Sequence, residues 1–151
     1  GQSREEKLVV IDATKSGPPL AQLLGYDCAA GWSDMLAARA TLSETMHATP
    51  WANVTLIPRG SAQPEFYEET CLRQASALGA LQRDYRAVWI LTAGAWDEAA
   101  QVTSQHVRER QLIVPMNCPA SEWRELNAKL VAGNVLVNGW VAFGSSHGVQ
   151  Q

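Results

Sequence analysis

The chain has 151 residues, 46% of them hydrophobic, which suits one globular domain with a substantial core. Its net charge of −3, without long runs of like charge, argues against a surface that binds nucleic acid or inserts into an anionic membrane. Three widely spaced cysteines argue against a disulfide framework and a zinc site, and no apolar run is long enough to span a bilayer, so we expect a cytoplasmic protein.

Apolar strand patterns alternate with helical patterns along the sequence. In chain order we expect strand 7–12, helices 18–25, 33–39 and 43–47, strand 53–58, helix 64–83, strand 86–92, helix 95–108, strand 111–116, helix 119–132 and strand 134–143. Several of the strands are continuous apolar runs, which are typical of parallel strands covered on both faces.

Strands that alternate with helices predict an α/β fold with right-handed crossovers. We expect three layers, in which a mostly parallel sheet of about five strands has helices on both faces. No internal repeat or low-complexity linker interrupts the pattern, so residues 1–144 are expected to form a single α/β domain. The polar, glycine-containing residues 145–151 are expected to be a flexible tail.

Ligands of such folds gather at the carboxyl ends of the parallel strands, where Asp12 and then Lys15 follow the first strand. Asp12 could hold a magnesium-bound water, cap the following turn, or pair with Lys15. Lys15 could attract an anion or stay solvated. No second acidic residue lies beside Asp12 and no glycine-rich phosphate loop precedes Lys15, so we expect no metal site here.

A second candidate site is the segment CPASEWR, which has a C-x5-R spacing from Cys118 to Arg124 between a strand and a helix. Phosphatases use this spacing, with a thiolate nucleophile and an arginine that binds the oxyanion. The segment lacks glycine, however, and Glu122 would repel a phosphate. Pro119 suits the first turn of a helix, and we favour that interpretation.

The order of three motifs indicates a family. The segments VVIDATKSGPPLAQLLG (9–25), GWSDMLA (31–37) and LSETMHATPWANVTLIPRG (42–60) together resemble the cytoplasmic kinase domain of bacterial tyrosine kinases. Those proteins work in capsular and exopolysaccharide synthesis and export, and belong to the P-loop group that includes partition-type ATPases. The resemblance covers roughly residues 7–144 and is most specific in the first 65. It implies a P-loop NTPase-like fold that is truncated and lacks the phosphate loop that precedes these motifs in the family.

The differences from the family fall on its nucleotide-binding residues. The family's second phosphate-site motif has two aspartates and an arginine, whereas this chain keeps Asp12 and has Thr14 and Ser16 in the other positions. Leu91 or Thr92 stands where the family has a magnesium-associated aspartate.

The remaining differences lie at the two ends of the family pattern. Phe143 stands where the family has an asparagine that contacts adenine, and the glycine-rich phosphate loop is missing. The tail also lacks the tyrosines that the family autophosphorylates. Because phosphoryl transfer depends on charge compensation around the phosphates, these changes imply the loss of catalysis.

The resemblance therefore implies a non-catalytic relative of the tyrosine kinase domain, a binding or regulatory module in exopolysaccharide or capsule synthesis and export. It implies no catalytic residue, with Asp12 and Lys15 as vestiges of the cofactor site, and ATP with Mg²⁺ only if an upstream segment supplies the loop. The implied partner is a membrane component of polysaccharide export, and either that partner or an upstream segment would hold the module at the inner membrane. A missing first strand would leave a sheet edge open, so we also expect a homo-oligomer.

Two enzymatic alternatives remain open on the sequence. An upstream segment or a partner could complete an ATPase or tyrosine kinase, and a phosphatase could depend on Cys118.

Overall fold

The computed structural model of the chain describes residues 7–15, 17–27, 30–92, 111–115, 119–132 and 139–143. The chain divides into two compact units, Gly1–Gly94 and Ala95–Gln151, and each is described by itself. The expectation of a single domain over residues 1–144 stays a prediction, and residues 145–151 lie outside the described residues.

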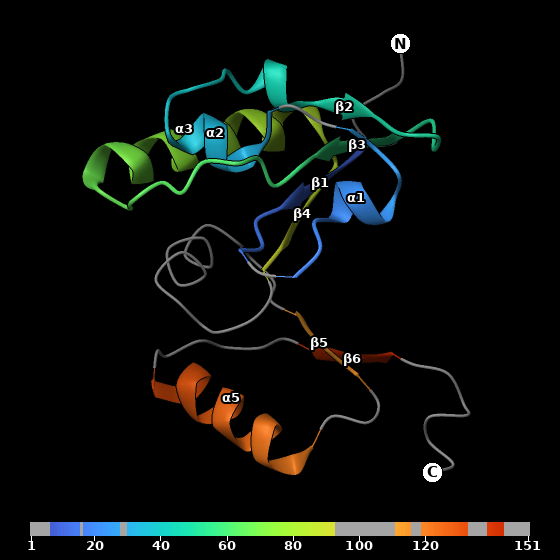
Figure 1. Ribbon diagram of the computed structural model, residues 1–151, viewed down its shortest axis with the longest axis vertical. Coiled ribbons are helices and arrows are strands. Elements are labelled where there is room, and N and C mark those ends of the chain that lie inside the picture. The colour runs from blue at the N-terminus through green and yellow to red at the C-terminus, as the bar shows by residue number, and fades with distance from the viewer. Residues whose placement is uncertain are drawn as a thin grey trace. The chain divides into compact units, whose positions relative to one another are not determined.

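The first unit is built on a mixed sheet. Its elements are β1 (Leu8–Asp12), α1 (Leu20–Leu23), α2 (Trp32–Leu36), the short 3-10 helix η2 (Ser43–Thr45), β2 (His47–Ala48), β3 (Val54–Ile57), α3 (Glu68–Asp84) and β4 (Ala87–Leu91). The strand order is β2-β3-β1-β4, with β1 parallel to both β3 and β4 and β2 antiparallel to β3 (Figure 1). The mixed α/β fold with a mostly parallel sheet is therefore confirmed.

The second unit contains β5 (Gln111–Pro115), α5 (Ala120–Ala132) and β6 (Gly139–Phe143). The two strands are parallel and in direct register from Gln111 beside Gly139 to Pro115 beside Phe143. The strand–helix–strand order is the one that joins parallel strands. All the expected strands form, although they pair in two sheets. The helix expected at 95–108 lies outside the described residues.

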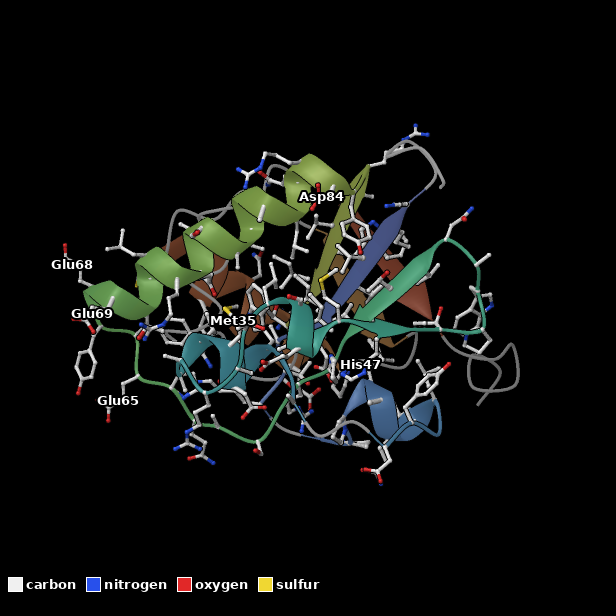
Figure 2. All side chains as sticks on the ribbon, turned by 90° about the horizontal axis from the view of Figure 1, so that it is seen from above. Met35, His47, Glu65, Glu68, Glu69 and Asp84 are labelled. Carbon is white, nitrogen blue, oxygen red and sulfur yellow. The ribbon has the colours of Figure 1, made fainter. Side chains whose placement is uncertain are left out.

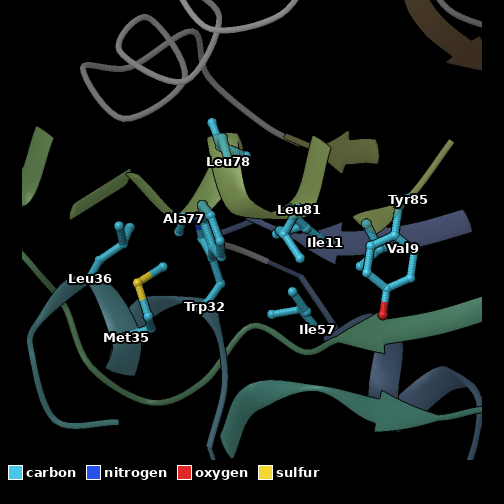
Figure 3. Packing of buried hydrophobic residues seen from close by; sticks show 10 residues of the cluster. All are labelled: Val9, Ile11, Trp32, Met35, Leu36, Ile57, Ala77, Leu78, Leu81 and Tyr85. Carbon is cyan, nitrogen blue, oxygen red and sulfur yellow. The ribbon is translucent and has the colours of Figure 1, made fainter. Parts of the chain in front are cut away.

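The core of the first unit lies between one face of its sheet and helices α2 and α3 (Figure 3). Side chains alternate between the two faces of a strand, so Val9 and Ile11 of β1 reach this face together, and Ile57 of β3 lies beside Ile11. The buried cluster consists of Val9, Ile11, Trp32, Met35, Leu36, Ile57, Ala77, Leu78, Leu81 and Tyr85. Each large apolar side chain contributes about 1.5–3 kcal/mol by burial, so this cluster fixes α2 and α3 on the sheet.

Two elements differ from the sequence prediction. The helix expected at 43–47 is only the turn η2, and His47 begins β2 instead. That strand forms because it pairs with β3, a contact between segments that a local pattern does not show. The long helix α3 begins at Glu68, after an irregular segment from Ser61 to Tyr67. Among the helices of the described residues, none combines the length and the apolar character that crossing a bilayer requires.

Candidate functional site

Asp12 lies at the carboxyl end of β1, the edge at which parallel strands of this fold type place their ligands. Its side chain is only 1% exposed. Oδ1 accepts hydrogen bonds from the Thr14 hydroxyl and from the Thr14 amide, the latter at 3.0 Å. Oδ2 accepts the amide of Leu20 at 2.8 Å, at the start of α1. Of the three roles considered for Asp12, these hydrogen bonds show the capping of the following turn and helix.

Arg59, which follows β3, reaches across the same edge to the turn after β1. Its Nε and Nη2 atoms donate to the Thr14 hydroxyl at 3.1 and 2.6 Å, and Nη1 donates to the carbonyl of Gly17 at 2.9 Å. Since Thr14 in turn donates to Asp12, the three side chains form one hydrogen-bonded series. The strand pattern placed Arg59 at this edge, but no local signal joins it to Thr14, 45 residues away.

The strands beside β1 place no carboxylate next to Asp12 within the described residues. Leu91 of β4 is in register with Asp12, and its carbonyl accepts the amide of Ala13 at 2.9 Å. On the other side of β1, Ile57 of β3 lies beside Ile11. Across the parts of the chain that the structure describes, no group of three or more histidine, cysteine, aspartate or glutamate side chains could hold a metal ion. The neighbour of Asp12 in β4 is therefore the apolar Leu91, one of the two residues that the resemblance places at the family's magnesium-associated aspartate.

Lys15 is exposed in the turn between β1 and α1. Together with Asp12, Thr14 and Arg59 it forms the strand-end site, while Ser16 lies outside the described residues. An anion could meet the positive charge of Lys15 and Arg59 here. A metal-bound water at Asp12, however, would compete with the donors of Thr14 and Leu20 for a buried carboxylate, and each of those donors left unpaired would cost about 1–3 kcal/mol.

Two loops beside the strand-end site are held together by their backbones. The amides of Trp32 and Ser33, where α2 begins, donate to the carbonyls of Pro58 and Arg59 at 2.7 and 3.0 Å. Parallel pairing of β1 and β3 brings Arg59 to the end of β1, and this contact with α2 fixes the loop that carries it. The start of α2 thus positions Arg59.

The carboxylate of Asp34 also joins the start of α2 to the loop after β3, and this residue is 6% exposed. Its Oδ2 accepts the amides of Gly31 and Ser61 at 2.9 and 3.3 Å. Its Oδ1 accepts the amide of Ala62 at 3.1 Å and the hydroxyl of Ser61 at 3.3 Å. A Cβ on Gly60, which has a φ of 83°, would lie 2.4 Å from Oδ2, so glycine is required there for both conformation and space.

Acidic side chains gather around the start of α3. Figure 2 shows Glu65, Glu68 and Glu69 at this end of the helix and Asp84 at the other. Glutamates in the first turn interact favourably with the helix dipole. The hydroxyl of Tyr67 donates a hydrogen bond to the carboxylate of Glu65. This bond is the main reason that the pKa of the exposed Tyr67 is raised above its ordinary value, and the negative charge of Glu65 raises it further.

The phosphatase alternative depends on residues that are only partly described. Cys118 lies outside the described residues, and so does its geometry with Arg124, which is exposed on α5. The side chain of Phe143 also lies outside them, although its backbone belongs to β6. The roles expected at these positions stay untested.

No protein-family model matches the sequence, and no curated protein matches it. The fold is of the P-loop NTPase type, in which the solved neighbours include tyrosine kinase domains and partition proteins. The kinase domain of VpsO has a TM-score of 0.73 at 16% identity, over 93% of this chain and 71% of that one. The kinase domain of the Escherichia coli tyrosine kinase ETK has a TM-score of 0.76 at 22% identity, over 91% and 55%.

A third solved structure, the Pyrococcus horikoshii septum site-determining protein MinD complexed with Mg-ADP, has a TM-score of 0.67 at 18% identity, over 90% of this chain and 57% of that one. The chain thus spans between 55% and 71% of the length of these structures. The predicted resemblance to bacterial tyrosine kinase domains is confirmed for the fold.

Proposed function

We propose that this chain is a non-catalytic relative of the bacterial tyrosine kinase domain and acts as a binding or regulatory module in exopolysaccharide or capsule synthesis and export. The observation that carries the proposal is the hydrogen bonding of Asp12. Both of its oxygens accept hydrogen bonds from Thr14 or Leu20, and its neighbour in β4 is the apolar Leu91.

Phosphoryl transfer needs metal ligands, a lysine and backbone donors arranged around the phosphates. At the strand-end site the second carboxylate of the family motif is replaced by the neutral Thr14, which accepts Arg59 instead of facing a metal. The guanidinium of Arg59 donates its hydrogen bonds to the Thr14 hydroxyl and to the carbonyl of Gly17. These contacts support a site that stabilises the fold rather than one that binds a nucleotide.

The partner that we propose is a membrane component of polysaccharide export, and the module would work in the cytoplasm, held at the inner membrane through that partner. The support is the fold shared with the VpsO and ETK kinase domains together with the order of motifs in the first 65 residues. We propose that no nucleic acid takes part, since the net charge is −3.

Titration with Mg-ATP and Mg-ADP tests the loss of nucleotide binding. Because the strand-end carboxylate is occupied, we expect no saturable heat in calorimetry and no phosphate release. Pyrococcus horikoshii MinD, whose structure holds Mg-ADP, is the positive control. Micromolar binding that Lys15→Ala weakens, or measurable ATP hydrolysis by this chain, would contradict the proposal. Hydrolysis that appears only with natural upstream sequence attached would support the alternative of a completed ATPase.

We also propose that the chain forms homo-oligomers through β4. Among the described strands β4 pairs only with β1, its residues Ala87–Leu91 carry no charge, and Trp89 is 59% exposed. An uncharged edge strand is a template for pairing with another chain. Light scattering is expected to show a dimer or larger species that Trp89→Lys converts to monomer. Trp51→Lys, at a tryptophan that is 56% exposed before β3, is the matched control and should leave the mass unchanged. A wild-type monomer at high concentration would refute this.

A further inference from the structure

A groove away from the strand-end site has the size of a small-molecule site. It lies between α3 and the segment that follows α2, and its volume is about 520 Å³. Sites for small organic ligands typically enclose about 300–1,000 Å³. Its apolar floor is made by Met35, Leu42, Ala77 and Ala80, of which Met35 and Ala77 belong to the buried core (Figure 3). We call it the arginine groove, after Arg39 and Arg73, which complete its wall.

The charge of the arginine groove is positive in a chain whose net charge is negative. Arg39 is exposed, and Arg73 is half-buried, with its Nε donating to the carbonyl of Leu36 at 2.9 Å. Neither guanidinium has a carboxylate partner among the described residues. The bond from Nε fixes the plane of Arg73 and leaves its Nη donors available, so this arginine is held in place for a ligand.

One carboxylate, that of Glu44, also lines the arginine groove. It is engaged with the backbone: Oε2 accepts the amide of Thr41 at 3.2 Å, and the Thr41 hydroxyl accepts the amide of Glu44 at 3.3 Å. This reciprocal pair is a capping box and directs the carboxylate to the backbone. The ionic groups that line the groove therefore sum to a net charge of +1, from the two arginines and Glu44.

The backbone that carries Arg39 is set by the end of α2. Ala38 has a φ of 60°, and its amide donates to the carbonyl of Met35 at 3.0 Å, while the amide of Arg39 donates to the carbonyl of Asp34 at 2.8 Å. This pair of bonds is a Schellman motif with alanine at the position that usually holds glycine. The wall of the groove is thus formed before any ligand binds, which lowers the entropy lost on binding.

We propose that the arginine groove binds a small organic phosphate. The guanidinium groups of Arg39 and Arg73 offer planar, charged hydrogen-bond donors that suit the oxygens of a phosphate, and the apolar floor accommodates the uncharged part of the molecule. This site uses no residue of the strand-end site, so it does not depend on the proposed loss of nucleotide binding.

Amide NMR titration of the full chain tests the site, with inorganic phosphate, glucose 6-phosphate and glucose as probes. We expect saturable shifts at residues 38–41 and 76–80 with both phosphates, tighter binding of glucose 6-phosphate, and no shifts with glucose. Shifts at Lys15 and Arg59 instead would report the strand-end site and overturn this proposal. The absence of any shift at about 10 mM phosphate would overturn it too, since a pair of charge-assisted contacts should give a stronger affinity.

Three variants separate this site from general electrostatic attraction. Arg39→Gln removes no side-chain hydrogen bond to the described residues and is expected to weaken binding about tenfold. Arg73→Gln should weaken it at least as much, although it also loses the bond to Leu36. Arg83→Gln removes the same charge from the exposed last turn of α3, outside the groove, and should leave binding unchanged. If Arg83→Gln weakens binding as much as Arg39→Gln does, the attraction is nonspecific and the proposal is wrong.

Discussion

Replacing Gly31 with alanine is expected to lower the free energy of unfolding by about 3 kcal/mol or more. A Cβ at this position would lie 2.3 Å from the backbone nitrogen of Gly60 and 2.3 Å from the carbonyl oxygen of Pro58. These atoms cannot retreat easily, because the amide of Trp32 is bonded to that same carbonyl at 2.7 Å. The requirement is for space alone, since the φ of Gly31 is −149°, which any residue adopts.

Urea unfolding followed by tryptophan fluorescence measures this effect. Gly79→Ala is the matched control, because a Cβ at Gly79 meets nothing within 4 Å and the residue lies inside α3. There we expect an increase in stability of up to about 1 kcal/mol, from the higher helix propensity of alanine. Equal unfolding midpoints for Gly31→Ala and the wild type would show that the two loops are not packed as described.

Replacing Asp34 with alanine is expected to cost about 3 kcal/mol, because its buried carboxylate accepts four hydrogen bonds. Without it, the buried amide of Gly31 and the more accessible amides of Ser61 and Ala62 lose their acceptor, and a buried donor left unpaired costs about 1–3 kcal/mol. Solvent that enters the loops would recover part of this loss. The loop that carries Arg59 should loosen as well.

The same unfolding assay, together with hydrogen exchange, tests the role of Asp34. Asp84→Ala removes an exposed carboxylate at the end of α3 and should change the stability by no more than about 0.5 kcal/mol. Faster exchange is expected at Ser61 and Ala62 in Asp34→Ala alone. Unchanged exchange at these amides would indicate that Asp34 does not hold the loop after β3.

Strands β1, β3, β4, β5 and β6 were predictable because each is a mainly apolar run, such as AVWIL in β4, a composition typical of parallel strands. β2 was not predictable, since only two residues, His47 and Ala48, form it and they depend on pairing with β3. The start of α3 was misplaced for a related reason. Pro64 suits a first helical turn, but the chain stays irregular until Glu68.

The strand-end site was also predictable only in part: local pattern indicated its residues, and the tertiary structure determined their contacts. The strand pattern placed Asp12 at the sheet edge, and the substitutions at Thr14 and Ser16 indicated a site without its usual charges. The partner of Thr14 followed only from the parallel pairing of β1 with β3, which brings Arg59 across 45 residues. Local composition determines which segments become strands and what stands at their ends. Which of those ends share hydrogen bonds depends on strand order and register, because these bring together residues that are far apart in the chain.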